Sequence, residues 1–148
     1  MAVNASQLSL PQLDNVKTQL EEEVQLIQSS MQQLKTVQRK LKDSQDSLET
    51  ITPENEGKTI LVPLTNSMYV PGKLKNCDKV IVDVGTGYYV EKGTKEASQF
   101  FQRKIDYVTK NLEKMQGVLI EKMKMRESIV SVMQMKIAGM EQTQTVAK

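Results

Sequence analysis

Residues 80–92 read VIVDVGTGYYVEK, two runs of β-branched and aromatic residues on either side of a Gly-Thr-Gly turn. Such runs favour strands, and a short glycine-containing turn joins two of them into a hairpin. The stretch before it has the same character, because KTILVPL at 58–64 is followed by a Thr-Asn-Ser turn and by a second strand that begins at Met68. The sequence therefore predicts two successive β-hairpins in residues 58–92.

Side-chain alternation assigns faces to the strand that begins at Lys79. Val80, Val82 and Val84 fall on one face, and Ile81 and Asp83 fall on the other. Four strands of about five residues, with few aromatic residues, are marginally stable by themselves. Their open apolar edges are a hazard unless they are paired. We therefore expect these strands to pair with strands of other subunits and to form an intersubunit β-barrel.

Apolar residues on both sides of the hairpins recur at alternating steps of four and three, the pattern of a coiled-coil seam. In the first half they are Leu20, Val24, Ile27, Met31, Leu34, Leu41 and Leu48. Gln38 and Gln45 hold the two seam positions that remain. In the second half they are Phe101, Ile105, Val108, Leu112, Met115 and Leu119, and the register loosens after Gly117. These patterns predict helices over 10–51 and 95–142.

A helix, a β insert and a second helix must fold back on themselves, so the two helices run antiparallel. The predicted fold is α+β and mostly α: a long antiparallel coiled-coil helical hairpin with two central β-hairpins. Its length of 148 residues indicates a single domain, residues 1–148.

Composition argues against catalysis and against a bound cofactor. The chain has no His, and Cys77 is its only Cys, so neither an intrachain disulfide nor a metal site with nitrogen or sulfur ligands is available. The Gly85-Thr86-Gly87 turn lacks the third glycine and the following helix of a dinucleotide-binding loop. We find no case for an enzyme, a metal site or a cofactor.

Charge and hydropathy bear on partners and location. Residues 1–56 carry a net charge of −4, and residues 94–148 carry +4, which favours pairing of the two helices and gives only weak support for nucleic-acid binding. Neither a secretory leader nor a run of 18 apolar residues is present. We expect no membrane association and a cytoplasmic location, with entry into the nucleus left open.

The second helix is rich in methionine toward its end, and this stretch has two readings. Met is an acceptable filler of a coiled-coil seam, but it also forms adaptable surfaces that bind varied partners. A seam needs two positions in seven, whereas Ile129, Val130, Val132 and Met133 lie within five residues. The surplus favours a binding surface, in which some of these residues also serve the seam.

Two stretches resemble the signature of the α-type prefoldin subunits: residues 82–92, VDVGTGYYVEK, and residues 61–74, LVPLTNSMYVPGKL. The resemblance covers nearly the whole chain and is greatest to the eukaryotic members. It implies an ATP-independent chaperone hexamer of two α-type and four β-type subunits, with a double β-barrel body and six coiled coils. The coiled-coil tips of this family bind unfolded proteins, including actin and tubulin, which pass to the cytosolic chaperonin.

The resemblance also assigns residues to two roles. The subunit-assembly surface comprises Ile60, Val62, Leu64, Met68, Val70, Val80, Val82, Val84, Tyr88 and Val90. The client-binding tip comprises Leu8, Leu10, Leu13 and Val16 from one end of the chain, and Val130, Met133, Met135, Ile137 and Met140 from the other. The tip residues rest on position and apolarity. An alternative function remains, a structural coiled-coil adaptor in a prefoldin-like regulatory assembly that docks folded proteins.

Overall fold

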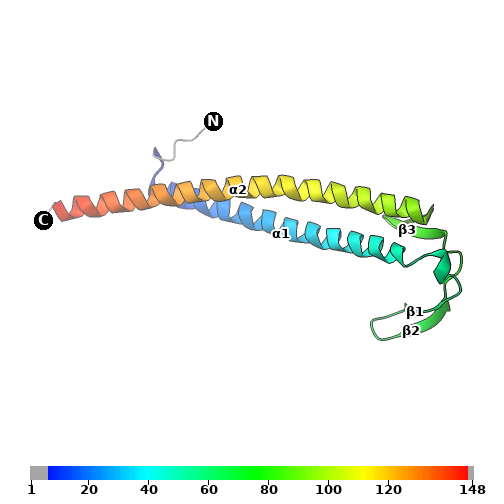
Figure 1. Cartoon of the computed structure of the whole chain (residues 1–148). Coiled ribbons are helices and arrows are strands. Elements are labelled where there is room, and N and C mark those ends of the chain that lie inside the picture. Colours follow the sequence, from blue (N-terminus) through cyan, green and yellow to red (C-terminus); the bar gives the residue numbers. More distant parts are fainter. Residues whose placement is uncertain (1–6, 147–148) are drawn as a thin grey trace. The chain divides into compact units, whose positions relative to one another are not determined.

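The computed structural model describes residues 7–146 of the chain and the side chains of residues 7–140. Two long helices flank two β-hairpins along the chain (Figure 1). The elements are α1 (Leu10–Glu49), the short 3-10 helix η2 (Pro53–Asn55), β1 (Thr59–Pro63), β2 (Tyr69–Lys73), β3 (Lys79–Gly85), β4 (Tyr88–Gly93) and α2 (Thr94–Val146). The predicted fold class is confirmed.

The helix ends differ from the expected ones by a few residues. Helix α1 ends at Glu49, just ahead of the turn that leads to Pro53, and α2 starts at Thr94. Helix α2 also continues to Val146, past the expected end at residue 142, because the sequence after Gly139 contains no further Gly or Pro to stop it. Helix α2 is therefore longer than the stretch of apolar periodicity from which it was predicted.

Local signals in the sequence account for the start of α1. The side-chain carbonyl of Gln12 accepts a hydrogen bond from the backbone N–H of Ser9 at 2.9 Å, and the Ser9 carbonyl accepts one from Leu13 N–H at 2.9 Å. A Ser followed by Gln three residues later is the pattern of a capping box. Pro11 lies in the first turn, where its missing N–H breaks no helical hydrogen bond.

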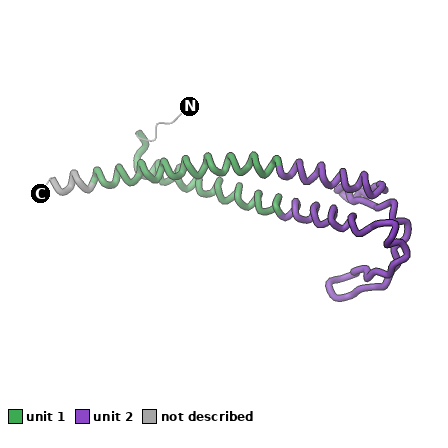
Figure 2. The backbone as a smooth tube through the Cα atoms, in the orientation of Figure 1, with its two compact units in different colours: residues 1–35, 110–148 green, residues 36–109 purple. Residues whose placement is uncertain are grey.

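The chain divides into two compact units, residues 1–35 with 110–148 and residues 36–109 (Figure 2). In the first unit, α1 and α2 bury one apolar stripe each, and Val24, Met31 and Leu119 form its core. Two ion pairs flank this core: Lys122 Nζ lies 2.6 Å from Glu23, and Arg126 Nε lies 4.0 Å from Glu21. All four of these charged side chains are partly exposed, so the pairs contribute little stability.

In the second unit, two positions of the helix–helix seam are occupied by polar residues, Gln38 and Gln45, as the sequence predicted. Gln38 Nε2 donates a hydrogen bond to Thr109 Oγ1 at 2.7 Å, and Gln45 Nε2 donates one to Gln102 Oε1 at 3.1 Å. Each glutamine thus has a partner on the facing helix. Polar seam residues of this kind specify register at some cost in stability.

The connection between the hairpins ties the second unit together. Its residue Cys77 is buried, and the backbone N–H of Asn76 donates to Glu56 Oε1 at 3.0 Å. The backbone carbonyl of Asp78 accepts a hydrogen bond from Thr94 N–H, the first residue of α2, at 3.1 Å. This connection therefore contacts both the segment that precedes β1 and the start of α2.

The strands form two separate antiparallel sheets, β1 with β2 and β3 with β4. Val62 lies opposite Val70 in the first sheet, and Val82 lies opposite Val90 in the second. A bulge between Asp83 and Gly85 interrupts the second sheet next to its turn. The register shift leaves Val84 without a directly paired residue on β4, so the ladder is irregular at this position.

The β3–β4 turn holds a threonine in an unfavourable backbone conformation. Thr86 has a φ of 53° and Gly87 a φ of 80°, so both central residues of this two-residue turn have positive φ. Asn-Gly is the preferred pair for such a turn, and a β-branched residue there is strained.

We predict that Thr86→Asn stabilises the chain by about 0.5–1 kcal/mol, because Asn tolerates the left-handed region far better than Thr. The measurement is the free energy of unfolding from a denaturant titration. Thr86→Val is the matched control, since it keeps the branched Cβ and should give no gain. An equal gain from both variants would show that strain at this position is not the cause.

Candidate functional site

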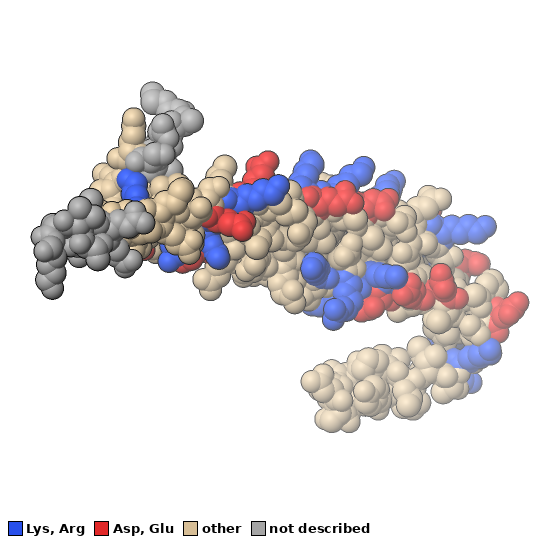
Figure 3. All heavy atoms as spheres, turned by 60° about the vertical axis from the view of Figure 1, so that its left-hand side comes forward, with Lys and Arg blue, Asp and Glu red and all other residues tan. Residues whose placement is uncertain are grey.

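The β1–β2 hairpin exposes apolar side chains on both of its faces. Ile60, Val62, Leu64, Met68 and Val70, all assigned to assembly from the sequence, are exposed in the single chain. The opposite face carries exposed Leu61 and Tyr69, which sequence reasoning left out. No Asp, Glu, Lys or Arg occurs between residues 59 and 72, and Figure 3 shows this hairpin without charged atoms along most of its length. An uncharged hairpin that is apolar on two faces is typical of a surface covered by another chain.

The β3–β4 hairpin differs, because one of its faces is partly covered within the chain. Val82 is only 3% exposed and Val80 is partly buried, whereas Val84, Tyr88 and Val90 are exposed. The other face carries Ile81, which is 73% exposed, and Tyr89. This hairpin therefore has an inner face on the helices of its own unit and an outer face that the single chain leaves uncovered.

One ion pair joins the two strands of this hairpin. Lys79 Nζ lies 2.6 Å from Glu91 Oε1, and the hydrogen bond and the charge of Glu91 raise the pKa of Lys79. Both side chains are largely exposed, so the pair adds little to stability.

The open edges of both sheets carry the structural argument for assembly. Each sheet has two strands, so one edge of every strand lacks a partner among residues 7–146, and no closed barrel exists within that range. Exposed edges next to apolar faces are sites of strand addition by another chain. The arrangement is consistent with a barrel that forms between subunits.

The residues assigned to the tip lie in the first unit, which contains the first part of α1 and the last part of α2. Lys136 Nζ donates a hydrogen bond to the backbone carbonyl of Leu8, which places the start of the described chain beside α2. Leu8, Leu10, Val16, Val130 and Met133 are partly buried. The structure therefore brings both halves of the predicted tip together.

Leu13 has a different place in the first unit from the other tip residues. Its exposed fraction is 0%, and it is the largest fully buried side chain in the described part of the chain. It supports the helix pair and offers no surface in this conformation.

Helix α2 extends past the start of α1, and this overhang exposes apolar side chains. Figure 1 shows α2 continuing past the start of α1, and Lys136 Nζ reaches the carbonyl of Leu8, which precedes the first residue of α1. Ile137 and Met140 therefore lie close to the end of the helix pair. Counted in sevens from buried Leu119, Met133 and Met140 return to the side that faces α1. Yet Ile137 is 46% exposed and Met140 is 56% exposed. These exposed side chains form an apolar surface near the end of the helix pair.

Comparison with known proteins agrees with this geometry. Residues 20–139 match the family model described as prefoldin subunit. The chain belongs to the prefoldin family of chaperone subunits. It is 49% identical to prefoldin subunit 5 of Homo sapiens over 92% of this chain and 88% of that protein, and 37% identical to the probable prefoldin subunit 5 of Drosophila melanogaster over 93% and 82%. The resemblance to eukaryotic α-type subunits that the sequence predicted is thereby confirmed.

A solved structure supports the fold independently of sequence. A filamentous PFD from Methanocaldococcus jannaschii, determined by cryo-EM, superposes with a TM-score of 0.70 over 79% of this chain and 98% of that one. The two sequences are only 22% identical, so this match concerns the fold alone. Prefoldin subunits assemble with other prefoldin subunits, which agrees with the open sheet edges of this chain.

The described residues contain neither a cluster suited to a metal ion nor a membrane-spanning helix. No group of three or more Cys, Asp or Glu side chains there is arranged to hold a metal ion. No helix in that part of the chain has the length and apolarity needed to cross a membrane.

We predict that Val82→Asp combined with Val84→Asp prevents assembly with other prefoldin subunits. Val82 is buried within this chain, where a carboxylate would disrupt the hairpin, and a carboxylate at exposed Val84 would be costly to cover with another subunit. The native mass of the purified complex measures the effect. Lys79→Asp combined with Lys92→Asp is the control, since it also adds acidic residues to this hairpin but at exposed or partly exposed positions. A complex of normal mass from the Val82 and Val84 variant would show that this face is not an assembly face.

Proposed function

We propose that this chain is one α-type subunit of a prefoldin heterohexamer that binds unfolded proteins without ATP and passes them to the cytosolic chaperonin. Actin and tubulin chains are the proposed clients, as the resemblance to eukaryotic prefoldins implies. The neighbours in the hexamer would be one further α-type subunit and four β-type subunits. The proposal assigns the chain no catalytic step and no cofactor.

The overhang of α2 is the observation that carries the client-binding part of the proposal. Met140 has the heptad position of a seam residue, and both Ile137 and Met140 are exposed near the end of the helix pair. An exposed apolar surface of flexible methionine and branched side chains binds varied apolar segments without demanding one sequence. Unfolded proteins present such segments, whereas folded proteins bury them.

The proposed location is the cytoplasm, with a fraction of the protein in the nucleus left open. The proposed clients and the chaperonin are cytosolic, which supports this location. Imaging of the chain labelled at its native level would test this, and confinement to a membrane-bound compartment other than the nucleus would contradict it.

The first test is the native mass and subunit composition of the complex purified from its own cells through this chain. A particle of six prefoldin-type chains is expected. A homodimer, or a larger assembly with folded regulatory proteins, would instead favour the structural adaptor.

We predict that Met133→Ser, Ile137→Ser and Met140→Ser together reduce the suppression of client aggregation without dissolving the complex. The reason is that they remove apolar surface at the tip and leave the hairpins unchanged. Light scattering of a diluted unfolded client, at matched concentrations of intact complex, measures the effect. Leu26→Ser, Tyr107→Ser and Val118→Ser form the control, because these side chains are also exposed but lie elsewhere on the helices.

A second set of variants separates a holdase from a specific adaptor. Met133→Leu, Ile137→Leu and Met140→Leu keep the apolar surface but change its shape, so a holdase should retain its activity. A specific docking site should instead fail after one or two such changes. If the triple serine variant forms an intact complex and suppresses aggregation as well as the unaltered chain does, these residues are not the client-binding tip.

A further inference from the structure

Helix α2 carries, in the second unit, an exposed group of aromatic and basic side chains that belongs neither to the hairpins nor to the tip. Four residues line a shallow hollow of about 320 Å³ there: Phe100, Arg103, Lys104 and Tyr107. Successive steps of three or four residues along a helix place side chains on one face. These four residues are called the basic aromatic patch.

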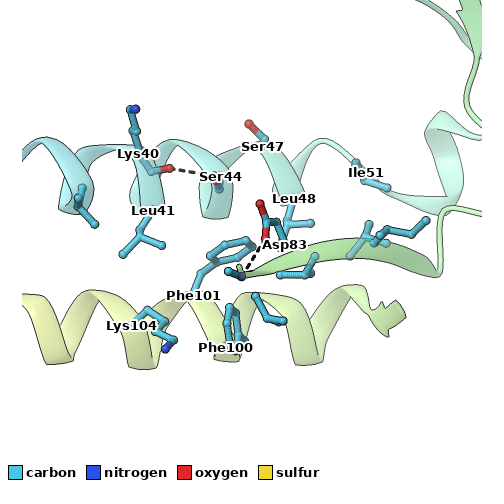
Figure 4. Close-up of a pocket in the computed structure, with 16 residues that line it drawn as sticks. Lys40, Leu41, Ser44, Ser47, Leu48, Ile51, Asp83, Phe100, Phe101 and Lys104 are labelled. Carbon is cyan, nitrogen blue, oxygen red and sulfur yellow. Dashed lines mark hydrogen bonds between the residues drawn. The ribbon is translucent and has the colours of Figure 1, made fainter. Parts of the chain in front are cut away.

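The patch lies on a different side of α2 from the seam. Figure 4 shows Phe101 pointing toward α1 and Lys104 pointing away from it. The seam residue Val108 is buried, whereas Tyr107 beside it is 66% exposed. The helix pair therefore does not use the exposed side chains of the patch for its own packing.

Phe100 is the partly buried base of the patch. Its ring packs edge-on against the ring of Phe101, with the ring centres 5.7 Å apart and an angle of 71° between the planes. Lys104 Nζ lies 5.6 Å from the centre of the Phe100 ring, which is a cation–π contact. An ammonium group held over a ring has less freedom to lose when it binds an anion.

The two cations of the patch have no acidic partner in the part of the chain whose side chains the structure describes. Arg103 and Lys104 are both exposed, and neither forms an ion pair there. The acidic residue that follows them on the helix, Asp106, accepts a hydrogen bond from Gln102 Nε2 at 2.9 Å instead. The patch therefore presents positive charge beside aromatic surface.

This combination fits an acidic peptide segment better than it fits a nucleic acid. A guanidinium group can bind a carboxylate through two parallel hydrogen bonds, and an exposed tyrosine offers a large apolar contact area. An exposed ion pair alone contributes little, so the aromatic contact is needed for measurable binding. Two cations are few for a nucleic acid, because its affinity depends on neutralising many phosphates.

We propose that the basic aromatic patch docks a short acidic segment, with an apolar side chain next to its carboxylates, from a protein outside the prefoldin complex. The carboxylates contact Arg103 and Lys104, and the apolar side chain packs on Phe100 and Tyr107. The patch lies on a helix and has no open strand edge, so strand pairing between subunits does not cover it. The proposal does not depend on client binding at the tip.

Binding of a labelled peptide to the purified complex tests the proposal. The probe is a short Glu-rich peptide that contains one Phe, and fluorescence anisotropy measures its dissociation constant. Arg103→Glu with Lys104→Glu should weaken binding roughly fivefold or more, since like charges then face each other. Absence of binding to the unaltered complex would overturn the proposal.

The same pair of residue types on α1 gives a matched control. Arg39→Glu with Lys40→Glu makes the same change of charge at adjacent exposed positions of the second unit. Neither Phe nor Tyr occurs three residues before or four residues after Arg39. This variant should bind the peptide as the unaltered chain does, and an equal loss in both double variants would show that the patch is not the site.

Tyr107→Ser tests the aromatic part of the contact. It should weaken binding of the Phe-containing peptide roughly threefold and have little effect on a peptide in which Ser replaces that Phe. An equal effect on both peptides would mean that the apolar contact does not exist. Circular dichroism and the native mass of the complex establish that each variant folds and assembles.

Two further outcomes would assign the patch to a different occupant and overturn the proposal. One is an oligonucleotide of equal charge that binds more tightly than the peptide and is equally sensitive to the Arg103 and Lys104 reversal. The other is a loss of assembly in that variant, which would show that another prefoldin subunit covers the patch. Suppression of client aggregation should be unchanged in every intact variant, because the tip is not altered.

Discussion

The constraint on which this structure depends is that a pair of helices can bury only one stripe of each. In the first unit, Val24, Met31 and Leu119 lie in that stripe. In the second unit, Gln38 and Gln45 lie in it and form hydrogen bonds to the facing helix. An apolar side chain outside this stripe is buried only where a hairpin or another molecule covers it. The chain therefore reaches a folded state while many of its apolar residues remain exposed, and those residues are where its interactions lie.

The exposed residues fall into classes with different physical demands. The hairpins combine apolar faces with open strand edges, and edge hydrogen bonds require a partner strand in one register. The overhang of α2 has no open edges, because a helix satisfies its own backbone, so under the proposed function it binds apolar chains without fixing their register. This difference explains how one chain can combine a permanent assembly surface with a surface suited to transient binding.

Sequence reasoning predicted the local structure well where the signal is local. Heptad spacing predicted both helices, and the β-branched runs with their glycine turn predicted both hairpins. It missed Leu61, Tyr69, Ile81 and Tyr89, although these too are apolar and alternate with the residues that it named. Assigning one buried face to each hairpin was the reason, since both faces of β1–β2 are uncovered in the single chain.

The sequence by itself determined the helices, the hairpins and the family, because periodicity and turn chemistry are properties of neighbouring residues. Only the tertiary structure decided which tip residues are buried. Leu13 and Met140 look equivalent as apolar residues near helix ends, yet Leu13 is 0% exposed and Met140 is 56% exposed. Burial depends on where the partner helix begins and ends, and that register is set by contacts between residues far apart in the chain.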